Sequence, residues 1–178
     1  MQFICIMGVS GSGKSTIENK LETMGFTRSI SYTTREPRVR DGVAEVDGKE
    51  YRFVNKEKFL QLVDKGIIIE YEEYNGNLYG TPEPYGSTSY VAVVCLKGYR
   101  ALKEKYGKQV VGIYLKCDDE IATARAKSRD SSEEFINKRK EEDRAVAIQM
   151  EQEADIVINS GGGINNTIAE ILKYIKKN

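Results

Sequence analysis

Gly8-Val9-Ser10-Gly11-Ser12-Gly13-Lys14-Ser15 is the stretch that decides the fold of this sequence. It follows a short apolar run, Phe3–Met7, and a helical pattern begins within it at Lys14. Glycines between a strand and a helix let backbone N–H groups turn inward around phosphate oxygens, at the positive end of the helix dipole. The stretch therefore predicts a phosphate-binding loop for a nucleoside triphosphate, and the alternative is a chance glycine turn that caps a helix.

The residues of this loop have separate expected tasks. Gly8 and Gly13 permit backbone torsions and close approach that a Cβ atom would obstruct. The Lys14 ammonium can reach the β- and γ-phosphates, and the Ser15 hydroxyl can ligate Mg²⁺. We expect the phosphates of ATP to be bound by the following residues: Gly8, Ser10, Gly11, Ser12, Gly13, Lys14, Ser15 and Thr16.

The composition is that of one ordinary globular domain of 178 residues. Lys plus Arg equals Asp plus Glu at 27 each, so the net charge favours neither nucleic acid nor a membrane as a partner. No histidine is present, which excludes imidazole bases and His-ligated metals. No apolar run reaches the roughly 18 residues of a membrane span, and no signal peptide precedes the loop. With Cys5, Cys95 and Cys117 as reduced thiols, we expect a cytoplasmic protein.

Apolar runs alternate with helical patterns along most of the chain. This alternation predicts a P-loop fold, a three-layer α/β/α domain with a five-stranded parallel sheet. The expected strands are Phe3–Met7, Arg28–Tyr32, Tyr90–Leu96, Val110–Leu115 and Asp155–Asn159. The expected helices are Lys14–Met24, Gly98–Tyr106, Asp119–Ala126, Ser132–Glu153 and Ile164–Ile175.

Residues 33–83 interrupt this alternation and predict a small inserted lobe outside the main sheet. The segment contains a polar stretch (Asp41–Lys49), a strand (Glu50–Val54), a helix (Lys56–Lys65), and a hairpin formed by Ile67–Tyr74, the turn Asn75-Gly76-Asn77 and Leu78-Tyr79. The resulting division of the single domain 1–178 is a core of residues 1–32, 84–124 and 145–178, the lobe 33–83, and a lid at 125–144.

Several motifs of this sequence resemble those of guanylate kinases, which make GDP from GMP and ATP. The resemblance is carried by Ser31-Tyr32-Thr33-Thr34-Arg35-Glu36-Pro37-Arg38, Gly48-Lys49-Glu50-Tyr51-Arg52-Phe53-Val54, Phe59, Ile69-Glu70-Tyr71 and Asn75-Gly76-Asn77-Leu78-Tyr79-Gly80-Thr81-Pro82. It continues at Ile136-Asn137-Lys138-Arg139 and Asp155-Ile156-Val157-Ile158-Asn159, so it covers most of the chain.

The resemblance implies roles for residues outside the loop. Arg35, Arg38, Tyr51 and Tyr79 would bind the acceptor phosphate, and Ser31, Glu70 and Thr81 would bind the base. Lys14 with Arg125, Arg129 and Arg139 would stabilise the transferring group, and Asn159 would contact ATP. An ionised Glu70 accepts only, so it suits the N1–H and N2–H₂ donors of guanine. Without the surrounding motifs, these arginines and Glu70 would be ordinary surface charges.

The sequence also departs from that family. Val93 and Cys95 stand where two aspartates are expected, Lys97 replaces a glutamine, and the insert Val39–Glu45 lengthens the loop before Tyr51. Valine and a thiol cannot organise Mg²⁺ or its waters as aspartates would. The acceptor is therefore expected to be GMP or dGMP, with another nucleotide or phosphorylated metabolite as the alternative.

A non-catalytic interaction module of the same fold is a further alternative, but the intact Lys14 and Ser15 argue against it. The expected partners are ATP with Mg²⁺ and the acceptor nucleotide. We expect a monomer or a homodimer that binds neither nucleic acid nor membranes.

Overall fold

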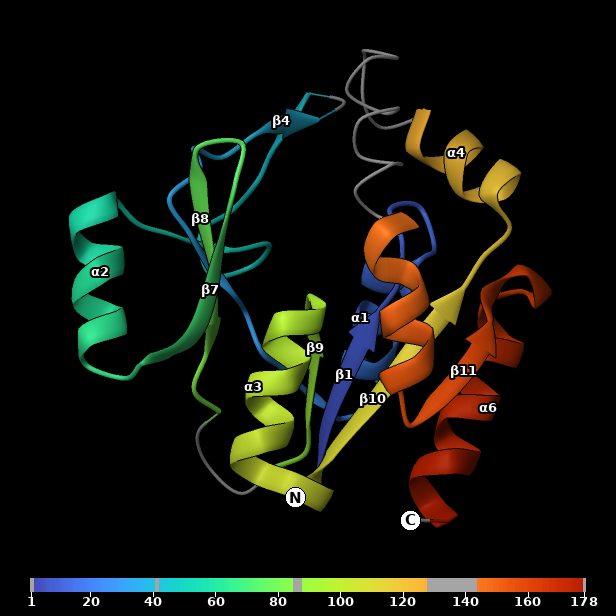
Figure 1. Ribbon diagram of the computed structural model, residues 1–178. Coiled ribbons are helices and arrows are strands. Elements are labelled where there is room, and N and C mark those ends of the chain that lie inside the picture. The colour runs from blue at the N-terminus through green and yellow to red at the C-terminus, as the bar shows by residue number, and fades with distance from the viewer. Residues whose placement is uncertain (1, 41, 85–87, 128–143, 178) are drawn as a thin grey trace.

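The computed structural model describes residues 2–40, 42–84, 88–127 and 144–177. A five-stranded parallel sheet with the order β11-β10-β1-β9-β2 forms the centre of the protein (Figure 1), which confirms the predicted fold class. Its strands are β1 (Phe3–Met7), β2 (Thr27–Arg28), β9 (Tyr90–Val93), β10 (Val110–Lys116) and β11 (Ile156–Asn159). The helices that accompany it are α1 (Lys14–Glu22), α3 (Leu96–Tyr106), α4 (Asp119–Lys127), a helix over residues 144–153 and α6 (Ile164–Lys177).

Strand β1 lies in the middle of this sheet because every one of its side chains is apolar and buried. It pairs in parallel with β10 on one side and β9 on the other, with Phe3 opposite both Val110 and Tyr90. Strands buried on both faces read as continuous apolar runs, as Phe3–Met7 does. The loop that follows Met7 therefore emerges at the carboxyl edge of the sheet, between two neighbouring strands.

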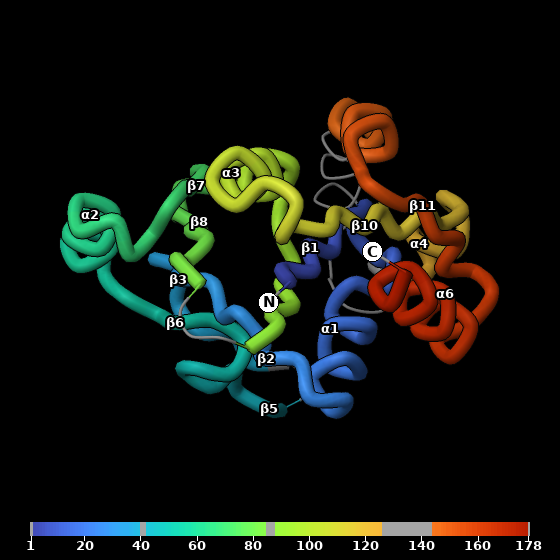
Figure 2. The backbone as a smooth tube through the Cα atoms, turned by 90° about the horizontal axis from the view of Figure 1, so that it is seen from below, coloured from blue at the N-terminus to red at the C-terminus, as the bar shows by residue number. Residues whose placement is uncertain are grey.

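Helices cover both faces of the sheet, as Figure 2 shows from below. On one face α1 and α6 contribute Ile17, Leu21, Ile168 and Ile171 to a core that includes Ile4 and Ile6. On the other face α3 contributes Leu96, Tyr99 and Leu102, and the helix at 144–153 adds Val146, Ala147 and Met150. Alternate residues of each strand thus enter two separate apolar cores, which is the layered arrangement that the alternating pattern predicted.

A second sheet with the order β6-β3-β8-β7 forms a separate lobe around α2 (Lys56–Asp64). Its strands are β3 (Tyr32–Thr33), β6 (Arg52–Phe53), β7 (Ile68–Tyr74) and β8 (Asn77–Pro82). The β7–β8 turn places Asn75 and Gly76 at φ 49° and 72°, the left-handed torsions of a tight hairpin. The predicted helix and hairpin are confirmed. Phe59 of α2 is fully buried in the core of this lobe.

The chain passes between the two sheets at two crossings. The first crossing, residues 29–31, joins β2 to β3, and the second, residues 83–89, joins β8 to β9. Ser29 donates its N–H to the Val91 oxygen, and Glu83 donates its N–H to the Ile67 oxygen. Backbone hydrogen bonds therefore anchor the first crossing to β9 and the start of the second crossing to the residue before β7.

Two predicted strands have different boundaries in the structure. The expected strand Arg28–Tyr32 is two short strands, β2 in the main sheet and β3 in the lobe, because the chain crosses between them. The expected strand Tyr90–Leu96 ends at Val93, and Leu96 begins α3. Cys95 is the N-cap of that helix, since its sulfur accepts the Gly98 N–H at 3.3 Å.

Three further segments differ from their sequence-based predictions. Strand Glu50–Val54 is reduced to β6, with Tyr51 bridged to Asp47. The insert Val39–Glu45 is not only a loop, because it contains a small hairpin of β4 (Val39–Arg40) and β5 (Val43–Ala44). Only the last part of the predicted helix Ser132–Glu153 falls within the described residues, and there it is helical from 144 to 153.

Among the helices in the described ranges, none has the length and apolar character needed to cross a membrane.

Candidate functional site

The phosphate loop leads into an open helix N-terminus. Gly13 is the N-cap of α1 with a left-handed φ of 93°, no side chain caps the helix, and its first turn contains no acidic residue. Uncapped N–H groups and the helix dipole together favour a bound anion. Ser15 and Thr16 are exposed in this first turn. The loop thus ends at an uncapped helix N-terminus, a geometry that favours an anion.

The Lys14 ammonium folds back over the loop. Its Nζ donates to the backbone oxygens of Gly8 and Val9, each at 2.8 Å. These two carbonyls hold the positive charge against the start of the loop. The Lys14 ammonium is therefore held at the loop before a nucleotide binds.

Gly11 packs against the backbone of α4, and this contact supports the loop. It has a φ of 82°, and a Cβ added there would lie inside van der Waals contact with the Ala122 carbonyl. We expect Gly11→Ala to shift the loop, weaken ATP binding and lower the free energy of unfolding. Gly25→Ala is the matched control, because Gly25 has a φ of 96° with open space around it. Its expected cost is only the left-handed strain of about 1–2 kcal/mol. Urea unfolding and ATP titration check both, and equal effects would contradict the packing role.

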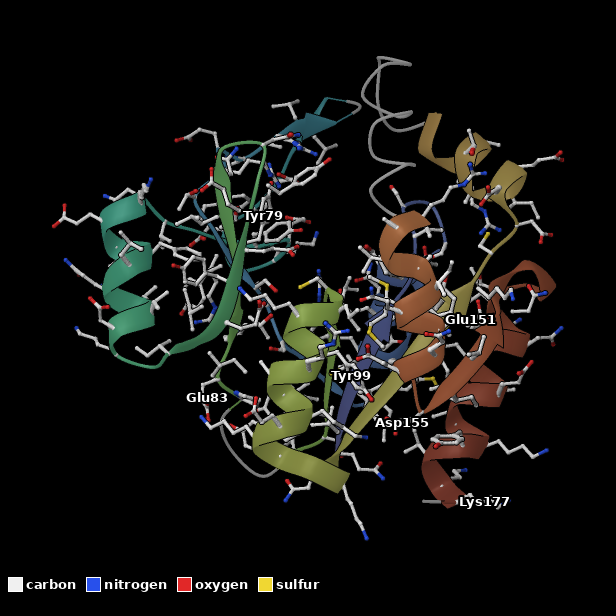
Figure 3. All side chains as sticks on the ribbon, viewed as in Figure 1. Tyr79, Glu83, Tyr99, Glu151, Asp155 and Lys177 are labelled. Atoms are coloured by element: carbon white, nitrogen blue, oxygen red, sulfur yellow. The ribbon has the colours of Figure 1, made fainter. Side chains whose placement is uncertain are left out.

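Arg35 is the centre of a cluster on the lobe. Its guanidinium is bound by the carboxylate of Glu45 through two hydrogen bonds, of 2.7 and 3.1 Å, and it lies 5.3 Å from the ring centroid of Tyr51. Tyr51 in turn meets the edge of Tyr79 at 5.8 Å. Arg38 joins the cluster through its backbone N–H, which donates to Glu45 at 2.8 Å. The structure therefore brings the side chains of Arg35, Tyr51 and Tyr79 together, and it connects Arg38 to them through its backbone. Figure 3 shows Tyr79 on the side of the β7–β8 hairpin turned away from α2.

Glu45 occupies the fork of Arg35 as a phosphate would, since a carboxylate and a phosphate each present two anionic oxygens that match the guanidinium donors. The side chains of Arg35 and Glu45 are only 9% and 11% exposed. Removing one partner of such a pair leaves a buried charge without compensation, at a cost of about 3–5 kcal/mol. Arg35→Ala is therefore expected to destabilise the protein strongly. The double variant Arg35→Ala/Glu45→Ala should recover most of that stability without recovering acceptor binding.

Thermal unfolding and titration with GMP measure these two effects separately. If the double variant bound GMP as well as the parent, Arg35 would have no role at the acceptor phosphate.

Glu70 and Thr81 lie at the other end of the hairpin, opposite each other in the β7–β8 register. Both side chains are buried, and the Thr81 hydroxyl donates to Glu70 Oε1 at 3.2 Å. Glu70 Oε2 is buried and accepts no hydrogen bond from the described residues; the nearest cation is Lys97 Nζ at 3.8 Å. Burial raises the pKa of Glu70, and Lys97 partly opposes that rise. The site thus offers a desolvated acceptor with an unused oxygen.

Cys95 and Lys97, at the start of α3, also lie close to Glu70. The Cys95 sulfur lies 3.9 Å from Glu70 Oε1, and burial raises the pKa of this thiol to about 12. Lys97 donates to the Tyr71 carbonyl. The thiol is therefore neutral at ordinary pH, and the carboxylates of Glu70 and Glu72 both contribute to the rise of its pKa. Cys95 also replaces a strong N-cap type, aspartate, by a weak acceptor.

The remaining predicted residues are less closely connected. Ser31 lies in the first crossing, where its backbone oxygen accepts the Arg52 N–H. Asn159 ends β11, and its side chain accepts the Gly161 N–H at 2.8 Å. Arg125 is an exposed residue of α4, 4.0 Å from the Cys117 sulfur. Arg129 and Arg139 lie outside the described residues.

Glu45 and Lys97 were not among the predicted site residues, although both contact one of them. Sequence carried a weak signal for Glu45, an acid in the polar stretch that follows Arg35 and Arg38. Lys97 was noted only as a departure from the family. Neither contact is local in sequence, so pattern alone could not find its partner.

A glycine loop at the carboxyl edge of a parallel sheet, followed directly by an uncapped helix, defines a P-loop nucleotide-binding protein. The guanylate kinase family model matches residues 1–178. Over 183 aligned residues the chain is 30% identical to a guanylate kinase of Prochlorococcus marinus subsp. pastoris, covering 98% of this chain and 97% of that protein. This chain belongs to the guanylate kinase family.

Other similarities agree with that membership. A guanylate kinase of Nitratidesulfovibrio vulgaris is 52% identical over 75 residues, but this match spans 41% of the chain and only 34% of that relative. The crystal structure of guanylate kinase from Anaplasma phagocytophilum superimposes with a TM-score of 0.71 at 29% identity, covering 99% of this chain and 85% of that one.

Proposed function

We propose that this protein transfers the γ-phosphoryl group of ATP to GMP or dGMP. The observation that carries the proposal is the arrangement of the lobe sheet. Glu70 and Thr81 pair across β7 and β8, and Tyr79 of β8 contacts Tyr51, which lies directly before β6. Arg35 follows β3 and lies against the Tyr51 ring. A carboxylate oxygen without a donor suits guanine N–H groups, and an arginine fork suits a phosphate. One lobe would thus hold both ends of a guanine monophosphate.

The donor would bind at the loop, with Mg²⁺ held through Ser15. The exposed Ser15 hydroxyl fits Mg²⁺, which normally retains several waters and uses nucleotide oxygens as ligands. The uncapped helix end favours the phosphates of the nucleotide. No cluster of three His, Cys, Asp or Glu residues is found in the part of the chain that the structure describes. When bound, the ion would neutralise charge on the phosphates. Among the described residues, Ser15 would be its protein ligand, and Val93 would not contribute one because it packs against an apolar core.

The protein's own contribution is positioning and charge neutralisation. An oxygen of the acceptor phosphate attacks the γ-phosphorus, a new O–P bond forms, and the bond to the β-phosphate oxygen breaks to release ADP. Lys14 would stabilise the charge on the transferring group, and Arg125, Arg129 and Arg139 would do so from the lid segment. No covalent bond to the protein is needed.

A substrate panel tests the proposal. Release of ADP, measured by a coupled assay with GMP, dGMP, AMP, CMP, UMP and dTMP, should be stimulated by GMP and dGMP. Stimulation by neither would contradict the proposal, and it would favour a kinase for another phosphorylated metabolite. Calorimetric titration with ATP and Mg²⁺ separates both from a non-catalytic module, which should bind little ATP.

A further inference from the structure

A largely buried ion pair joins α1, the helix that follows the phosphate loop, to β2. Glu18 of α1 and Arg28 of β2 have side chains 5% and 16% exposed, and Glu18 Oε2 is 2.9 Å from Arg28 Nε. The other carboxylate oxygen, Oε1, accepts the backbone N–H of Val93 at 3.0 Å. One carboxylate therefore connects α1, β2 and the last residue of β9.

The Glu18–Arg28 pair lies beside apolar side chains of the core. Its neighbours on α1 are Ile17 and Leu21, both buried in the core beneath the sheet. Burial raises the pKa of Glu18 even though Arg28 opposes it, so the charge is held there against a desolvation cost. Buried ion pairs are often no more stabilising than apolar replacements, and some are retained because they fix one arrangement. The position of this pair indicates that it fixes α1 relative to β2 and β9.

Each of the three connected elements leads to a different part of the candidate site. Glu18 lies one helical turn beyond Lys14 and Ser15, on the helix that the loop begins. Arg28 is the last residue of β2, directly before the first crossing to the lobe that carries Arg35 and Glu70. Val93 ends β9, two residues before Cys95 and the Glu70 contact. The carboxylate thus joins the donor side to the crossing that leads to the acceptor side.

The second crossing has a different kind of anchor. Glu83 there accepts Lys105 Nζ at 2.6 Å and the Tyr106 hydroxyl, and its place beside α3 is visible in Figure 3. The side chains of Lys105 and Glu83 are 51% and 32% exposed, so solvent screens this pair. In the part of the chain that the structure describes, it is the first crossing that is preceded by a largely buried pair reaching the loop helix.

We propose that Glu18 and Arg28 are positioning residues, which fix the phosphate loop relative to the acceptor lobe so that the two bound phosphates align. The inference rests on the proposed function, because alignment matters only if both nucleotides bind. Each nucleotide would still bind its own side without the pair. Misplacement of about 1 Å between reacting groups can lower a rate by about 10²-fold.

The test uses the double variant Glu18→Gln/Arg28→Met. Glutamine retains an oxygen for the Val93 N–H and methionine retains an unbranched apolar stem, so no buried charge is left unpaired. We expect kcat to fall at least about tenfold, with the separate affinities for ATP and GMP within about threefold of the parent. A bisubstrate compound of adenosine and guanosine joined by five phosphates should lose at least about tenfold in affinity, since it requires both sides at one spacing.

Arg100→Met/Glu153→Gln is the matched control. It removes an ion pair between α3 and the helix at 144–153, away from both crossings. The side chains of Arg100 and Glu153 are 52% and 36% exposed. Melting temperatures of both double variants should stay near the parent's. A Glu18→Gln/Arg28→Met protein with parental kcat and parental bisubstrate affinity would overturn the inference, as would a loss confined to stability or to one nucleotide. A parent that neither binds nor phosphorylates GMP would instead remove the proposed function, and this inference with it.

Discussion

Replacing Lys14 by methionine is expected to lower kcat by about 10³-fold or more while the fold is kept. The Lys14 ammonium is held over the loop by the carbonyls of Gly8 and Val9. It is therefore placed before the nucleotide arrives, and little reorganisation is needed as charge moves during transfer. Methionine keeps the unbranched stem and removes the charge. Phosphoryl transfer depends almost entirely on positioning and charge stabilisation, so the loss should appear mainly in kcat.

The control for this change is Lys20→Met, an exposed lysine in the last turn of the same helix. It has the same side-chain change and should leave kcat within about twofold, as surface substitutions generally do. Coupled ADP release with GMP measures both variants, and thermal unfolding verifies that each is folded. If Lys14→Met retained more than a tenth of the parental kcat, the loop lysine would not act on the transferring group.

The parts of the fold that were predictable are those set by local sequence. Phe3–Met7, the glycine loop and the start of α1 follow from one uninterrupted segment of apolar, glycine and helical residues. The β7–β8 hairpin follows from Asn75-Gly76, whose left-handed torsions only a few residue types accept readily. In each case neighbouring residues determine the structure without help from distant ones.

The parts that could not be predicted depend on contacts between distant segments. Arg28–Tyr32 was predicted as one strand, but the chain changes sheets within it because β2 pairs with β9 and β3 pairs with β8. Glu45 and Lys97 were missed as contacts of Arg35 and Glu70, which lie 10 and 27 positions away along the chain. Glu18 has the sequence pattern of a surface acid, and its burial is decided by Arg28 and Val93 across the sheet.

Replacing Glu70 by glutamine is expected to lower kcat/KM for GMP by about 10²-fold. Hydrogen bonds to a charged group contribute about 1.5–3 kcal/mol each, and the carboxylate would accept from both N1–H and N2–H₂ of guanine. Glutamine offers one oxygen and turns its amide N–H toward a donor. Inosine monophosphate lacks the N2 amine, so the parent's preference for GMP over it should shrink in the variant. Thr81→Val is the paired control, because it removes the 3.2 Å donor of Glu70 but keeps the charge.

The raised pKa of Glu70 allows its role in guanine binding to be tested a second way, through the pH dependence of kcat/KM for GMP. Burial raises this pKa above its ordinary value of 4.5, so the carboxyl protonates at a higher pH in the folded protein than in the unfolded chain. Ionisation of Glu70 therefore costs stability as pH rises past 4.5, and at neutral pH Glu70→Gln should be at least as stable as the parent. Guanine binding requires the ionised form, so kcat/KM for GMP in the parent should fall as pH drops through the raised pKa. The glutamine variant should lack that acidic limb. A stable Glu70→Gln protein with the parental GMP preference and pH profile would show that a group other than Glu70 recognises guanine.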